Sequence, residues 1–95
     1  MKTIFTITGM PAKVSLDNRS FGFYFDLDEA IDSVKRNRGD IHEDMFEYVV
    51  VEEYPEGVFS IPVNEYWFRF NRSLEIYIEC ERPEFLTYIK CFGFH

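Results

Sequence analysis

The sequence predicts an α+β fold, in which a mainly antiparallel sheet carries one well-formed helix on one of its faces. Residues 26–38 combine the start and stop signals of a helix with one apolar stripe. Segments with the alternating pattern of strands outnumber helical segments. The links between those strands are short, whereas parallel strands need long crossover connections.

The chain has 95 residues, which predicts a single domain over residues 1–95. It is 46% hydrophobic and 19% aromatic, so rings either fill a small core or lie on a binding surface. The formal net charge of −7 argues against a nucleic-acid-binding face and against an anionic membrane surface. The expected partners therefore include no nucleic acid and no membrane.

The cysteine content and the first residues predict a cytoplasmic protein. The chain has two cysteines, Cys80 and Cys91, where a secreted domain of this size usually has more. The start, MKTIFTITGM, lacks the long apolar core of a signal peptide, and no apolar run is long enough to span a membrane. We expect free thiols.

Two strands are predicted before the helix. Residues 3–8 are rich in β-formers, and residues 9–20 contain the Gly, Pro, Asp-Asn and Ser of a loop. Residues 20–25 alternate, which predicts a half-buried strand with one face formed by Phe21, Phe23 and Phe25.

The helix at 26–38 has the strongest local signals. Asp26 is a suitable N-cap, and Glu29 follows at the capping-box spacing. Acidic residues occupy the first turn and basic residues the last, which suits the helix dipole. Gly39 is predicted to end the helix in a left-handed conformation. The apolar stripe that should face the sheet consists of Leu27, Ala30, Ile31 and Val34.

Residues 45–54 carry apolar side chains on both faces, which predicts a central strand covered on two sides. Residues 55–57 predict a turn, and residues 58–63 a short extended segment that Pro62 keeps out of a central ladder. Pro83 favours the start of a short C-terminal helix, whose core-facing side would be Phe85, Leu86 and Ile89.

Residues 64–80 predict a hairpin. Placing Phe70 opposite Leu74 leaves 71–73 as the loop and sets Trp67 opposite Tyr77 and Arg69 opposite Glu75. The sheet face away from the helix should then carry Trp67, Arg69 and Tyr77, with Tyr24 or Val49 beside them.

That outward face is one candidate site. An exposed Trp67 and Arg69 with Tyr77 across could stack a base and hold a phosphate or carboxylate. The structural alternative is a cross-strand aromatic pair with an Arg69–Glu75 ion pair, or a face buried by the C-terminal segment or a second subunit.

The segment GDIHED, residues 39–44, is the other candidate. Asp40, His42 and Asp44 could point one way if extended. No further His or Cys pattern completes a metal site, so the best interpretation is a turn after the helix, with a ligand-contacting loop using Asp40 or His42 as the alternative.

Enzyme signatures such as a P-loop, Gly-x-Ser-x-Gly or His-Glu-x-x-His are absent from the sequence. Neither histidine is tied by a local motif to Cys80 or Cys91. We therefore expect no enzyme, no cofactor and no metal.

The segments FGFYFDLDEAIDSV, NRGDIHED, FEYVVVEEYPEG, YWFRFN and ERPEF followed by CFGF resemble a family of small uncharacterised bacterial and phage proteins. The family resemblance covers nearly the whole chain and implies no established activity. It implies a setting in phages or mobile elements, where small proteins often act as counter-defence factors, and it gives residues 40–43 more weight as a ligand-contacting loop.

The resulting hypothesis is a non-enzymatic binding protein, a homo-oligomer, that sequesters a nucleotide-like signalling ligand. Its ligand-binding residues would be Trp67, Arg69, Tyr77, Asp40 and His42. The alternative is an acidic inhibitor or adaptor that blocks a host protein, whose binding salt would weaken. A third hypothesis, an enzyme that uses His42 with Asp40 or Glu43, lacks a supporting motif.

Overall fold

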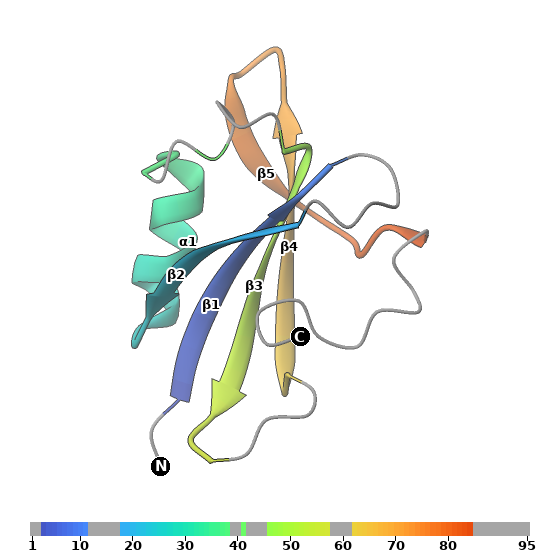
Figure 1. Ribbon diagram of the computed structural model, residues 1–95. Helices are drawn as coiled ribbons and strands as arrows, with labels where there is room; N and C mark the ends of the chain where they lie inside the picture. The colour runs from blue at the N-terminus through green and yellow to red at the C-terminus, as the bar shows by residue number, and fades with distance from the viewer. Residues whose placement is uncertain (1–2, 12–17, 39–40, 42–45, 58–61, 85–95) are drawn as a thin grey trace.

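A computed structural model of the chain describes residues 3–11, 18–38, 41, 46–57 and 62–84. These residues form a five-stranded antiparallel sheet with one helix packed against it, which confirms the predicted fold class (Figure 1). The predicted C-terminal helix lies outside the described residues from residue 85 onward, as does most of segment 58–63. The elements are β1 (Thr3–Met10), β2 (Arg19–Tyr24), α1 (Leu27–Lys35), β3 (Tyr48–Pro55), β4 (Asn64–Asn71) and β5 (Ile76–Cys80).

The strand order is β2-β1-β3-β4-β5, so β3 is the central strand, as its pattern predicts. β2 and β3 each pair with β1, one on either side of it. Helix α1 lies between β2 and β3 in the sequence and so connects these two strands. Val49 and Val51 of β3 belong to the cluster on the helix side, whereas Val50 belongs to a second cluster with Met10 and Trp67. Both faces of the central strand are therefore buried, and Val49 does not lie on the far face.

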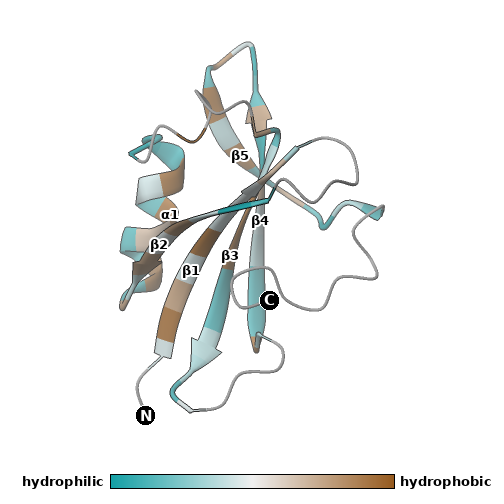
Figure 2. Cartoon of the chain, viewed as in Figure 1, coloured by the Kyte–Doolittle hydropathy of each residue, from teal (hydrophilic) through white to brown (hydrophobic). Residues whose placement is uncertain are grey.

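Helix α1 packs its apolar stripe on the sheet, where hydrophobic segments of α1 and β1 are visible in Figure 2. Ala30 and Val34 are fully buried, and Leu27 and Ile31 are partly buried against the same cluster. Asp26 occupies the N-cap position, as predicted, and its carbonyl accepts the Ala30 N–H at 3.1 Å. Its side chain makes no capping hydrogen bond, so Asp26 contributes its extended backbone and its charge.

The helix ends earlier than predicted, and Asn37 ends it in place of Gly39. Asn37 adopts the left-handed conformation, with φ of 52°. The Asn37 N–H donates to the Val34 carbonyl at 3.1 Å, and the Arg38 N–H to the Ser33 carbonyl at 2.9 Å. This is the bonding pattern of a Schellman motif, in which Asn is the usual substitute for Gly.

The predicted single face of β2 is wrong because the strand contains a bulge. Ile7 opposes Gly22 while Thr8 opposes Ser20, so the intervening Phe21 has no partner of its own in β1. Phe21 instead packs edge-on against Phe46, at 5.7 Å between centroids. Tyr24 packs on the helix-side cluster, so it too is absent from the far face. Phe23 and Phe25 remain exposed.

The β4–β5 hairpin forms, but in a register that differs from the predicted one. Tyr77 opposes Phe70 in place of Trp67, and Trp67 opposes Cys80. The loop has four residues, Arg72–Glu75, and is closed by the Glu75 N–H bonding to the Asn71 carbonyl at 2.8 Å. The β4 partner of Tyr77 therefore lies three positions from the predicted one. Because three is an odd number, every β5 side chain lies on the opposite face from the predicted one.

Candidate functional site: a hollow beside the β4–β5 hairpin

The predicted stacking platform is not formed, because Trp67 is buried. Its side chain is 5% exposed and belongs to the far-face cluster with Met10 and Val50. The indole N–H donates to Glu65 Oε1 at 3.1 Å, and the Arg82 guanidinium lies 5.7 Å from the ring centroid. Trp67 thus lies on the predicted face of the sheet, but it packs in a buried cluster there and its ring is not accessible to a ligand.

Tyr77 lies on the opposite face from Trp67, inside the helix-side cluster. It is 1% exposed, and its ring packs edge-on against Phe70 at 5.2 Å between centroids. Its hydroxyl donates a 2.6 Å hydrogen bond to the Phe46 carbonyl. Tyr77 is a core residue, and the predicted Trp67–Tyr77 pair is wrong.

Arg69 is the predicted site residue that remains exposed on the far face. Its guanidinium lies 5.5 Å from the centre of the Tyr48 ring and 3.9 Å from Glu47 Oε2. Its partner across the hairpin is Ile78, so the predicted Arg69–Glu75 pair is also wrong. A 3.9 Å separation is an ion pair without a hydrogen bond, which leaves the guanidinium N–H groups able to bind another acceptor.

The remaining predicted site residues, Asp40 and His42, lie outside the described residues. The prediction that they form a turn or contact a ligand stays a prediction.

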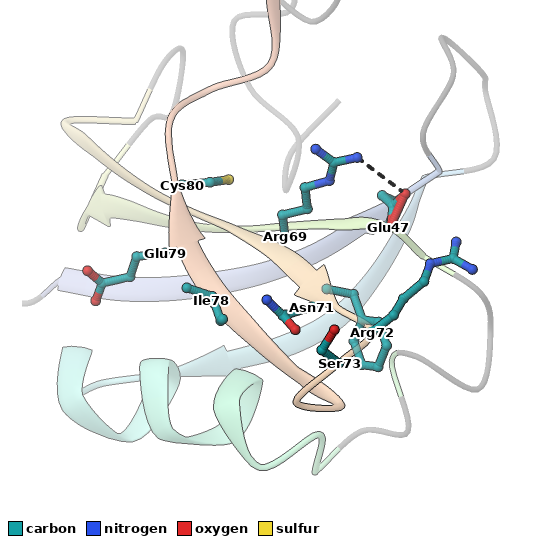
Figure 3. Close-up of a pocket in the computed structure, with 9 residues that line it drawn as sticks. Glu47, Arg69, Asn71, Arg72, Ser73, Ile78, Glu79 and Cys80 are labelled. Carbon is teal, nitrogen blue, oxygen red and sulfur yellow. Dashed lines mark ion pairs between the residues drawn. The ribbon is translucent and has the colours of Figure 1, made fainter.

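Arg69 lines a hollow of about 460 Å³ at the junction of the β4–β5 hairpin with the residue before β3 (Figure 3). Figure 3 shows Arg69 and Glu47 reaching toward one another, with Cys80 on the neighbouring strand. The volume falls in the range of small-molecule sites. The hollow is lined by Glu47, Arg69, Phe70, Asn71, Arg72, Ser73, Ile78, Glu79 and Cys80.

The hairpin turn holds one side of this hollow in place. Asn71 Oδ1 accepts the Leu74 N–H at 2.9 Å, and the Asn71 carbonyl accepts the Glu75 N–H at 2.8 Å. These two bonds close the turn that contains Arg72 and Ser73. The sequence alone predicted only a loop at these two residues. The signal that could have identified them is the spacing of Arg69 and Arg72, one on the outward face of a strand and one in the turn that follows it.

The thiol of Cys80 lies at the edge of the hollow, and burial favours its protonated form. Burial raises the pKa of Cys80 above its ordinary value, and Glu81 raises it further, while Arg69 lowers it in part. The thiol therefore stays protonated, whereas covalent catalysis needs the thiolate.

A second polar group, the ion pair of Glu65 with Arg82, contacts Trp67. Arg82 Nη1 lies 3.0 Å from both carboxylate oxygens of Glu65. Glu65 is the β4 partner of Glu52, which is fully buried. Across the described part of the chain, no group of three or more His, Cys, Asp or Glu residues could hold a metal ion. Both side chains of the partly buried Glu65–Arg82 pair contact Trp67, Glu65 through the indole N–H and Arg82 over the ring.

In the residues that the structure describes, no helix is long and apolar enough to cross a membrane. Comparison of the chain with protein-family models, with curated proteins and with solved structures gave no match.

Proposed function

We propose that the chain is a small non-enzymatic binding protein that holds an anionic small molecule in the hollow beside the β4–β5 hairpin. One observation carries the proposal: two arginines, Arg69 and Arg72, are among the residues that line a hollow on a chain whose net charge is −7. Guanidinium groups bind phosphate and carboxylate through paired, charge-assisted hydrogen bonds.

The ligand class follows from the lining. Arg69 and Arg72 would bind the anionic group of the ligand, while Ile78, which pairs with Arg69 across the hairpin, offers apolar surface to the rest of the ligand. Nucleotide-like ligands combine these features, and in the setting that the family resemblance implies, the protein would sequester such a signal. Stacking of a base on Trp67 is no part of the proposal, because Trp67 is buried.

The test is a titration followed by amide NMR shifts, with ADP-ribose and cyclic dinucleotides as ligands. We expect shifts at Asn71, Ile78 and Cys80, and an affinity roughly tenfold lower in Arg69→Gln and in Arg72→Gln, because each loses a charged hydrogen-bond donor. Arg36→Gln is the matched control: it removes the same charge from an exposed side chain at the C-cap of α1.

The proposal fails if no ligand shifts these amides, or if Arg36→Gln lowers the affinity as much as the hairpin variants. Native mass spectrometry of the same samples would count the subunits and test the expected homo-oligomer.

A further inference from the structure

Two aromatic side chains are exposed to solvent where β2 leads into α1. Phe23 is 55% exposed and Phe25 is 70% exposed. Their rings pack edge-on at 5.6 Å between centroids, with 83° between planes, so they form one projecting patch. The bulge at Phe21 explains why the pair faces outward, but it does not explain why two large apolar rings are kept there.

Three exposed carboxylates follow this aromatic pair within four residues of the chain. Asp26 follows Phe25 directly, and Asp28 and Glu29 lie in the first turn of α1. None of the ion pairs found among the described residues involves them, whereas Asp32 on the same helix pairs with Arg36 at 2.9 Å. The helix dipole favours acidic residues at this position, but it gives no reason for the neighbouring phenylalanines.

From this combination we propose that the β2–α1 corner, defined by Phe23, Phe25, Asp26, Asp28 and Glu29, is a docking site for a basic, amphipathic segment of another protein. Apolar side chains of that segment cover the two rings, and its lysine or arginine side chains face the three carboxylates. Exposed aromatic anchors with a charged rim are the pattern of interface hot spots.

Charge selects this occupant over others. Phosphate groups of nucleic acid or of an anionic membrane would be repelled by the three carboxylates and by the net charge of −7. A second copy of this chain brings the same negative charge to the contact. A basic segment gains from both the local and the overall charge, and its association is steered by them.

The test uses fluorescence anisotropy with a labelled amphipathic peptide of leucine and lysine. We expect binding that weakens as salt is added, because exposed charges are screened. Phe25→Ser should lower the affinity at least about tenfold, as loss of an aromatic anchor does, while Phe25→Leu should restore most of it. Replacing Asp28 and Glu29 together by Asn and Gln should flatten the salt dependence.

Leu74→Ser is the matched control, because Leu74 is 62% exposed on the hairpin at another edge of the molecule. It should leave peptide affinity unchanged. Equal losses in Leu74→Ser and Phe25→Ser, or no loss in Phe25→Ser, would overturn the proposal. So would binding of anionic vesicles in place of the peptide, or salt-insensitive self-association that Phe25→Ser abolishes. Circular dichroism of each variant checks that the fold is intact.

Discussion

The burial of a single side chain, Tyr77, shows which face of β5 packs in the core. Its hydroxyl donates a 2.6 Å hydrogen bond to the Phe46 carbonyl inside the helix-side cluster. Tyr77→Phe removes the donor and leaves a buried carbonyl unsatisfied, so we expect the free energy of unfolding to fall by about 1–2 kcal/mol. Urea denaturation followed by circular dichroism measures the change.

Tyr66→Phe is the matched control, since Tyr66 is half-buried against the same cluster. It should change the free energy of unfolding by no more than about 0.5 kcal/mol. An equal, small effect of both variants would mean that Tyr77 has an exposed hydroxyl, as in the register that the sequence alone suggests.

The end of α1 is set by backbone conformation at Asn37, where φ is 52°. A side chain with a β-carbon is strained in that conformation and glycine is not. Asn37→Gly should therefore be more stable to urea than Asn37→Ala, by about 1 kcal/mol. Comparing these two variants with each other cancels whatever the asparagine side chain itself contributes.

The same pair of substitutions at Arg36 is the control. Arg36 is the C-cap residue with φ of −93°, where alanine is not strained. There the alanine variant should be at least as stable as the glycine variant. A preference for alanine at both positions would show that Asn37 does not hold the left-handed conformation in solution.

These elements show how far local sequence signals reach. The start and the buried stripe of α1 were predictable because Asp26 and the 3.6-residue period are local features. Its end was missed because Asn37 can take the left-handed conformation without the glycine that normally signals it.

The hairpin was predictable in existence but not in register. Leu74, Ile76 and Ile78 form an apolar series that suggests a core face, yet all three are exposed and Tyr77 is buried. Both alternating sets contain large apolar residues, so the pattern does not identify the inward one. The turn depends on Glu75, which adopts a left-handed conformation with φ of 57°. Glutamate rarely adopts this conformation, so the residue type does not predict it.

At the scale of the whole molecule, the candidate site depended on this same register. The predicted platform required Trp67 and Tyr77 on one face, which the odd shift excludes. The hollow brings Arg69 and Arg72 of the hairpin together with Glu47, from the residue before β3. No local pattern joins segments so distant in sequence, whereas the α+β class needed only the number and period of the segments.

The sheet order predicts how stability is distributed over the molecule. β1 and β3 each have a strand on both sides and bury residues in the core, whereas β2 and β5 are the outermost strands of the described sheet. Native-state hydrogen exchange should therefore show the slowest amides in β1 and β3, exchanging by global unfolding, and faster exchange in β2 and β5 through local opening. Exchange in β5 as slow as in β3 would show that further pairing protects this edge. Since the hollow includes β5 residues and the β2–α1 corner includes a β2 residue, ligands at the two sites should slow exchange selectively in these outer strands.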